Sequence, residues 1–144
     1  HVGGSSRRLL VHRKGATRAF GPKRREVPSA YREFGQPVII PGSMGSASYV
    51  MTGTDAAMEE SFGSTCHGAG RKMSRRGAVR ATKGRNIADE LKERGIHARW
   101  RGGKTMREEA PEAYKDVDHV IRVVEGIGIS RKVARLRPMG VVKG

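Results

Sequence analysis

The chain has 144 residues, of which 29 are Lys or Arg and 14 are Asp or Glu, so its formal net charge is +15. Its length fits one domain of about 100–150 residues, and no apolar run approaches the ~18 residues that cross a bilayer. We expect no signal peptide or anchor, and the single cysteine, Cys66, excludes an internal disulfide framework and fits a reducing, cytoplasmic compartment. Composition therefore argues against a membrane protein, a secreted disulfide scaffold and a collagen-like fibre.

Lys and Arg occur in clusters, which predicts a phosphate-rich partner such as nucleic acid. Each cation placed on a phosphate releases condensed counterions, so binding should weaken as ionic strength rises. The clusters lie at residues 7–8, 13–14, 23–25, 71–72 and 75–80. For any single cluster, the alternative is a solvated surface that keeps the domain soluble. Charge leaves two classes open, an enzyme acting on nucleic acid and a non-enzymatic RNA-binding protein of the ribosomal type.

The first half of the chain predicts short strands separated by polar loops. Residues 1–8 are polar and glycine-rich, and we expect a flexible lead-in there to a folded segment at 9–144. Thr54 or Asp55 is suited to cap a helix that ends near Ser61. Short apolar or β-branched runs predict strands at 9–12, at 36–41 (typical of a buried strand) and at 49–51. Loops rich in Pro, Gly or Ser are expected at 21–28 and 42–48.

The second half predicts three helices and two extended segments. We expect one helix at 71–80, directly after Gly70, and another at 86–94 with Asn86 as its N-cap and Gly95 after its end. A third helix should begin near Asp116, because the apolar residues at 117, 120, 121 and 124 form one stripe. Residues 96–100 alternate like a strand, and 133–142 should be extended with an interruption at Pro138. Without a regular βαβ period, this mixture predicts an α+β fold of mixed sheets with flanking helices.

The segment at residues 62–71 is the richest candidate for chemistry. The small residues at 68–70 let backbone N–H groups approach a phosphate, and the helix predicted next would direct its positive end to the same place. Arg71 and Arg75 are four residues apart and would share a helix face, where they could hold further phosphates. His67 could then be a general base, a metal ligand or a nucleophile. The alternative is a glycine-rich turn with an ordinary exposed histidine.

Other candidate sites rest on weaker patterns. Cys66 precedes His67, but neighbours in an extended chain point in opposite directions, which favours a buried structural thiol over a Cys–His pair. Small residues and hydroxyls at 40–48 suit a loop that bonds a nucleotide phosphate or sugar, although Ser-rich turns are common. Tyr114 and Trp100 could stack on a base or be half-buried core aromatics. The histidines are too scattered to predict a metal site.

Five segments, taken in chain order, resemble the C-terminal part of the RtcB-type RNA-splicing ligases. They are Leu10–Phe20, Gly35–Gly45, Phe62–Arg71, Glu108–Lys115 and Arg137–Gly144. The most specific run is Thr-Cys-His-Gly-Ala-Gly-Arg at residues 65–71. The resemblance extends from about Leu9 to Gly144 and implies the C-terminal portion of a larger RtcB-like fold.

The resemblance implies a cytoplasmic RNA ligase that depends on GTP and manganese. Such a ligase joins a 2′,3′-cyclic phosphate or 3′-phosphate end of RNA to a 5′-hydroxyl end, in tRNA halves or in broken RNA. By that analogy, His67 attacks the α-phosphorus of GTP and forms a covalent histidine–GMP, and the GMP then passes to the RNA 3′-phosphate. The resemblance also implies a small accessory protein, archease, as a partner.

The resemblance assigns further roles by position. The residues that match guanylate-binding positions are Pro41, Gly42, Ser43, Met44, Ser48, His67, Gly68, Ala69, Gly70, Tyr114 and Lys143. Those that match positions holding the RNA ends are Lys14, Arg71 and Arg75. Because the family's manganese ligands lie upstream of the matched part, we expect no metal ligand in this chain. We also expect the isolated chain to be inactive.

Overall fold

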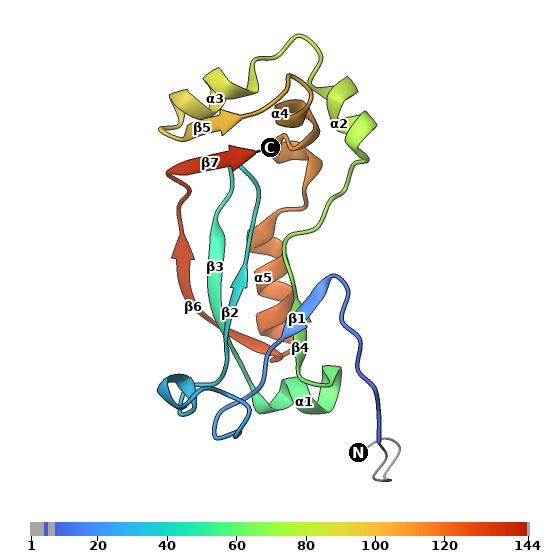
Figure 1. Cartoon of the computed structure of the whole chain (residues 1–144), viewed down its shortest axis with the longest axis vertical. Helices are drawn as coiled ribbons and strands as arrows, with labels where there is room; N and C mark the ends of the chain where they lie inside the picture. The colour runs from blue at the N-terminus through green and yellow to red at the C-terminus, as the bar shows by residue number, and fades with distance from the viewer. Residues whose placement is uncertain (1–4, 6–7, 144) are drawn as a thin grey trace.

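The computed structural model describes Ser5 and residues 8–143, so most of the predicted lead-in at 1–8 lies outside the described residues. The described residues form the predicted α+β arrangement, with helices packed against three small sheets (Figure 1). The chain has two parts, called here the head and the body. The head comprises residues 72–113 together with the last strand, and the body comprises residues 8–71 and 114–139. Figure 1 shows the head above the body, with the C-terminus in the head.

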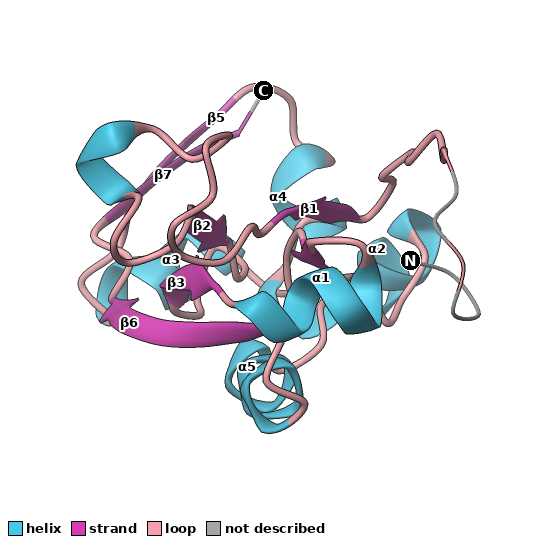
Figure 2. Ribbon diagram, turned by 90° about the horizontal axis from the view of Figure 1, so that it is seen from below, coloured by secondary structure: helices cyan, strands magenta, loops and turns pink. Residues whose placement is uncertain are grey.

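The body is built on an antiparallel sheet with the strand order β2-β3-β6. Its strands are β2 (Pro37–Ile40), β3 (Ser48–Gly53) and β6 (Ser130–Leu136). Helix α5 (Val117–Gly126) covers one face (Figure 2), and Val38 and Ile40 pack there with Val117 and Ile121. The other residues of β2 are exposed, so the predicted buried strand is buried on one face only, because α5 covers one side of the sheet.

A second, two-stranded sheet places the candidate loop. Strand β1 (Ala16–Arg18) pairs antiparallel with β4 (Ser64–Cys66), and helix α1 (Asp55–Ser61) connects β3 to β4. The predicted N-cap is confirmed, since Thr54 Oγ1 accepts a hydrogen bond from the Ala57 N–H at 3.3 Å. The strand predicted at 9–12 is wrong. Those residues form no strand and Leu10 is 85% exposed, whereas β4 was not predicted because its pairing partner lies about 50 residues away.

The head contains three short helices, a 3₁₀ turn and a parallel strand pair. Its elements are α2 (Arg75–Ala81), α3 (Ile87–Glu93), β5 (His97–Trp100), α4 (Thr105–Glu108), the 3₁₀ helix η2 (Pro111–Ala113) and β7 (Gly140–Lys143). Strand β5 pairs in parallel with β7. The hydrophobic core of the head consists of Ile87, Leu91, Ile96, Met106 and Ala110, and Met44 of the body is inserted among them. Another 3₁₀ helix, η1 (Ser29–Tyr31), follows the predicted basic loop in the body.

The helix predicted at 71–80 starts later than expected. Helix α2 begins at Arg75, because the Ser74 hydroxyl accepts a hydrogen bond from the Gly77 N–H at 3.0 Å. The preceding backbone is engaged elsewhere: the N–H groups of Lys72 and Met73 both donate to the Ala113 carbonyl, at 2.8 and 3.2 Å. The segment at 70–73 therefore joins head to body outside any helix, and Arg71 forms an antiparallel bridge with Tyr114.

The other predicted elements of the second half are confirmed. Asn86 caps α3, Gly95 follows its end with φ of +75°, and residues 97–100 form β5. Helix α5 buries Val117, Ile121 and Val124 of the predicted stripe, and the final segment is two strands separated around Pro138. Among the described residues, none of the helices combines the length and hydrophobicity that spanning a bilayer demands.

We expect Ile121→Ala to lower the free energy of unfolding by about 2–5 kcal/mol, because it leaves a cavity between α5 and the sheet. Val123→Ala is the matched control on the same helix. The Val123 side chain is 51% exposed, and its truncation should change stability by less than about 0.5 kcal/mol. Urea unfolding measures the free energy of unfolding of the two variants. If both variants lost the same amount, the packing of Ile121 between α5 and the sheet would be contradicted.

Candidate functional site

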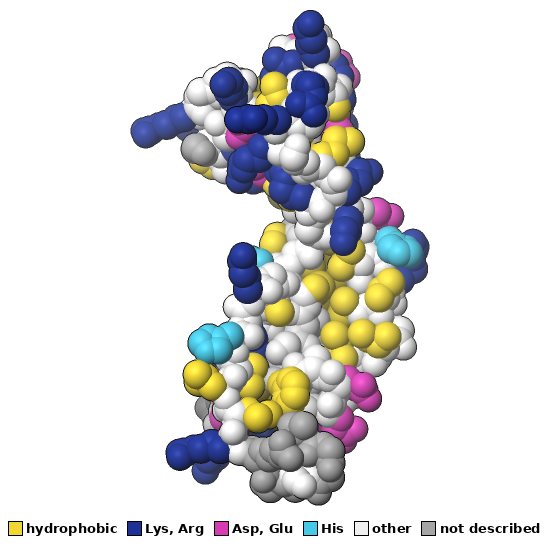
Figure 3. Space-filling model, turned by 90° about the vertical axis from the view of Figure 1, so that its right-hand side faces the viewer, with side chains coloured by type: hydrophobic (Ala, Val, Ile, Leu, Met, Phe, Trp, Pro, Cys, Tyr) yellow, Lys and Arg dark blue, Asp and Glu magenta, His cyan; other side chains and the backbone are white. Residues whose placement is uncertain are grey.

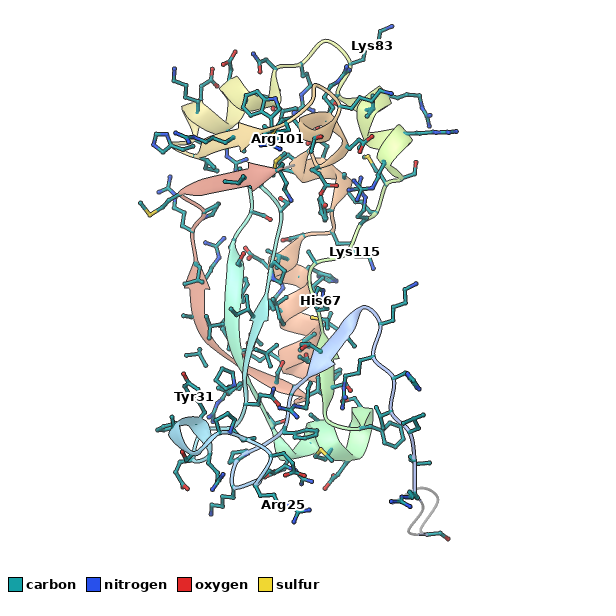
Figure 4. The ribbon with its side chains drawn as sticks, in the orientation of Figure 1. Arg25, Tyr31, His67, Lys83, Arg101 and Lys115 are labelled. Carbon is teal, nitrogen blue, oxygen red and sulfur yellow. The ribbon has the colours of Figure 1, made fainter. Side chains whose placement is uncertain are left out.

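His67 lies directly after β4, where the body faces the head (Figure 4). Its backbone N–H donates to the Gly15 carbonyl at 3.2 Å, and its side chain is exposed. It lines a hollow of about 370 Å³, called here the glycine-walled hollow. The lining residues are Gly15, Pro41, Gly42, His67, Gly68, Ala69, Gly70, Tyr114 and Lys143. The volume lies within the range of about 300–1,000 Å³ that is typical of small-ligand sites.

The wall of this hollow is made of residues without bulky side chains. The Ala69 N–H donates to the Pro41 carbonyl at 3.1 Å, which holds the loop after β4 against the loop after β2. Gly42 approaches Ala47 so closely that a Cβ there would collide with the Ala47 carbonyl oxygen. Gly70 has φ of +75°, a conformation that favours glycine. Main chain therefore forms much of the surface that a ligand would meet.

Eight of the eleven guanylate-binding positions predicted by resemblance line this hollow, and three do not. Met44 is buried in the hydrophobic core of the head. The Ser48 hydroxyl accepts a hydrogen bond from the Gly42 N–H at 3.3 Å, and the Ser43 hydroxyl lies 2.9 Å from that of Ser46. Ser43, Met44 and Ser48 thus hold the shape of the loop behind the hollow.

A carboxylate that the sequence analysis did not single out connects the two groups of predicted residues. Glu109 lies directly after α4, and its side chain is 10% exposed. Its Oε2 accepts the hydrogen bond of the Tyr114 hydroxyl and lies 3.7 Å from Lys143 Nζ. Its Oε1 lies 3.3 Å from Arg71 Nη1 and 2.7 Å from Arg75 Nη1. One carboxylate therefore contacts two predicted guanylate-binding residues and two predicted RNA-binding residues.

The charges around Glu109 fix its ionisation. Burial raises the pKa of this carboxyl, but the hydrogen bond from Tyr114 and the charges of Lys143, Arg75 and Arg71 outweigh it, so the pKa lies below its usual value. Burial and the neighbouring Glu109 carboxylate raise the pKa of the Tyr114 hydroxyl. At neutral pH the pair is therefore a carboxylate that accepts and a phenol that donates.

The three predicted RNA-binding cations differ in how far their side chains are bound within the protein and how far they are exposed to solvent. Arg71 Nη2 donates to the Glu108 carbonyl at 2.6 Å, its Nε donates to the Met73 carbonyl at 3.1 Å, and its guanidinium lies 5.0 Å from the Tyr114 ring centroid. The Arg75 side chain is 63% exposed. Lys14 is also exposed, in the loop next to Gly15. Arg71 is mainly a structural element here, and Arg75 and Lys14 are open to a ligand.

Two expectations about this segment are wrong. Arg71 precedes α2, so it does not share a helix face with Arg75, and the two meet through Glu109 instead. For the same reason, α2 does not begin at the glycine loop and does not direct its N-terminus there.

Cys66, predicted to be a buried structural thiol, is partly buried. It packs against two hydrophobic clusters of the body, and burial raises the pKa of its thiol. Trp100 lies in the head and does not line the glycine-walled hollow. Within residues 8–143 and Ser5, no group of three or more His, Cys, Asp or Glu side chains is placed to hold a metal ion.

We expect Glu109→Gln to lower the free energy of unfolding by about 1.5–3 kcal/mol, since it removes the charged acceptor of several part-buried donors. Glu125→Gln is the control. It weakens an exposed pair with Lys132 at 3.6 Å, and such pairs contribute about 0–1 kcal/mol. Chemical denaturation of both variants checks the order, and a loss no larger than that of the control would contradict it.

The same substitution should change the pH dependence of stability. Because the folded-state pKa of Glu109 is lowered, its contribution is complete above the unfolded-state pKa of ~4.3. It is lost as the pH falls through the lower folded-state value. As the pH is lowered from 6, the unfolding temperature of Glu109→Gln should therefore fall less steeply than that of the natural chain. Parallel plots of unfolding temperature against pH would refute the lowered pKa of Glu109.

Comparisons with known proteins all indicate the same family. The family model described as tRNA-splicing ligase RtcB matches residues 1–144. The tRNA-splicing ligase RtcB of Archaeoglobus fulgidus is 58% identical over 99% of this chain and 30% of its own length. The proteins of the same name from Pyrococcus furiosus and Thermococcus kodakarensis are 57% and 54% identical over 99% of this chain, which covers 15% and 30% of their lengths. The chain spans less than a third of these relatives, and it belongs to the tRNA-splicing ligase RtcB family.

Proposed function

We propose that the protein carrying this chain is a GTP-dependent RNA ligase that joins 2′,3′-cyclic phosphate or 3′-phosphate ends to 5′-hydroxyl ends through a histidine–GMP. Family membership supports an RNA ligase. The observation that carries the finer proposal is the exposed His67 at the edge of the glycine-walled hollow, opposite a lysine that is anchored in the head. Cleaved tRNA halves and broken RNA ends are the proposed substrates.

In the first step, a nitrogen of the neutral His67 imidazole attacks the α-phosphorus of GTP. A phosphorus–nitrogen bond forms, the bond from the α-phosphorus to the bridging oxygen breaks, and pyrophosphate leaves. The Lys143 ammonium lines the same hollow and is suited to stabilise the charge that develops on the phosphate. The small residues at 68–70 admit the phosphate close to the main chain.

The guanine end of the nucleotide is proposed to lie against Tyr114. The ring is held at its hydroxyl, which donates to Glu109, and on one face, which the Arg71 guanidinium covers. An aromatic ring fixed in this way offers its remaining surface for stacking without losing conformational freedom.

In the later steps, the RNA 3′-phosphate takes the GMP from His67, and the 5′-hydroxyl oxygen then attacks that phosphate and displaces GMP. We propose that Arg75 and Lys14 hold the RNA termini for these steps. Both side chains are exposed, and both lie beside residues that contact or line the glycine-walled hollow.

The manganese of this reaction is proposed to be bound by residues outside this chain. In the part of the chain that the structure describes, no three His, Cys, Asp or Glu side chains are grouped to hold a metal ion. The isolated chain should accordingly be inactive, and GMP incorporation by residues 1–144 alone would overturn that expectation. Archease is proposed as an accessory partner on the basis of the family alone.

We expect the complete natural protein to gain the mass of one GMP on incubation with GTP and manganese, and His67→Ala to abolish the gain. The adduct should be acid-labile, as a phosphorus–nitrogen bond is. His119→Ala is the matched control, since this histidine is exposed on α5, away from the hollow. Intact mass spectrometry gives the answer, and a folded protein without an adduct would favour the non-enzymatic RNA-binding protein.

We also expect Arg75→Ala to slow the joining of RNA ends by about tenfold or more while adduct formation is retained. The neighbouring Arg76→Ala removes the same charge from the same helix, but Arg76 lies outside the Glu109 cluster. Gel-based ligation and mass spectrometry on the same samples separate the two steps. Equal loss of both in Arg75→Ala would contradict a role on the RNA side.

A further inference from the structure

Trp100 is the only tryptophan of the chain and is 43% exposed at the end of β5 in the head. It stands between two hollows of about 180 and 440 Å³ and lines both of them, as does Ala88 of α3. Arg85 and Arg107 line the smaller hollow, and Lys92 and Arg99 line the larger one. The indole is therefore accessible on both sides of a ridge between cationic recesses.

The surroundings of this ridge carry excess positive charge. Figure 3 shows Lys and Arg gathered on the head, while hydrophobic side chains are prominent on the body. Within the described residues, Lys83, Lys92, Arg99, Arg101 and Lys104 form no ion pair with a carboxylate. Figure 4 shows Lys83 at the upper edge of the head and Arg101 in the middle of the head, beside β5.

Three other charged groups lie at the ridge: two are arginines that are already bonded within the protein, and one is a carboxylate. Arg85 is paired with Glu90 and Glu112, Arg107 donates to the Val79 carbonyl, and Asp89 lines the larger recess. Around Trp100, the cations that have no ion-pair partner among the described residues nevertheless outnumber this carboxylate. They include Lys92 and the two sequence neighbours of Trp100, Arg99 and Arg101. This combination of an exposed aromatic with cations suits an unpaired nucleotide, whose base stacks while its phosphates meet the cations.

The ridge is connected directly to the glycine-walled hollow. Trp100 is the register partner of Lys143 in the parallel pair β5–β7, so their Cα atoms are about 5 Å apart. The Arg101 N–H donates to the Lys143 carbonyl at 3.0 Å. Because Lys143 lines that hollow, an RNA strand that ends there has a short path over the head to Trp100.

We propose that Trp100 is a stacking platform for an unpaired nucleotide of the RNA, a few residues from the end being joined, with Lys92, Arg99 and Arg101 on the adjacent phosphates. The occupant is single-stranded RNA, so this inference rests on the proposed function. The observations that carry it are the exposed indole between two cationic recesses and its register with Lys143.

The test measures binding of a fluorescently labelled oligouridylate with a 3′-phosphate to the complete natural protein, by anisotropy. Trp100→Leu keeps apolar volume without a π face and should weaken binding by about 5- to 150-fold, the range for one stacked base. Trp100→Phe keeps a ring and should bind at least several-fold more tightly than the Leu variant. Equal affinities for the natural protein and Trp100→Leu would overturn the proposal.

Charge-matched variants separate a local contact from the net charge. Arg101→Gln should weaken binding more than Arg25→Gln, because Arg25 lies at the far end of the body in Figure 4. Equal weakening by the two would show that only net charge matters and would overturn the local contact. Polyglutamate is added as a competitor of matched charge, and displacement of the RNA as effective as that by unlabelled oligouridylate would point to an acidic protein partner instead.

Adduct formation with GTP, measured on the same samples, keeps this inference distinct from the proposed function. The Trp100 variants should form the adduct at the natural rate, which also verifies that they are folded. Absence of the adduct in the natural protein would refute the proposed chemistry while leaving a Trp100-dependent affinity for RNA in place. A normal adduct with no effect of Trp100→Leu on RNA binding would refute only the stacking platform.

Discussion

The side chains of the candidate site are held together by the carboxylate of Glu109. It is nearly buried, and four side chains from separate segments converge on it: Arg71, Arg75, Tyr114 and Lys143. Partly buried cations so close together would repel one another without an anion between them. The carboxylate therefore lets a strongly basic chain gather positive charge at one place, and it fixes the Tyr114 ring and the Lys143 ammonium at the hollow.

The second constraint is the junction between head and body. Residues 70–73 and 113–115 are connected there by backbone hydrogen bonds, while Met44 of the body is inserted into the core of the head. The glycine-walled hollow draws on both parts, with His67 on the body and Lys143 on the head. Because the two parts are joined at these points, the distance between His67 and Lys143 is set by the fold.

Local patterns predicted the elements that are stabilised locally. The apolar stripe of α5 and the Asn86 cap of α3 depend on residues within a few positions, and both are confirmed. Strand β4 depends on β1, and residues 72–73 are kept out of α2 by hydrogen bonds to Ala113, so neither could be predicted from short windows of sequence. Motif resemblance indicated His67 and its glycines. Glu109 escaped notice because its partners lie up to 38 residues away and only the fold brings them together.

We propose that His67 in this hollow receives a guanylyl group, and a crystal structure of the complete natural protein, grown with GTP and manganese, would show whether it does. We expect continuous density from the His67 imidazole to a phosphorus atom, with the base against Tyr114 and with Lys143 within reach of the nucleotide. A nucleotide bound elsewhere, with the His67 ring unmodified and the glycine-walled hollow empty, would contradict it.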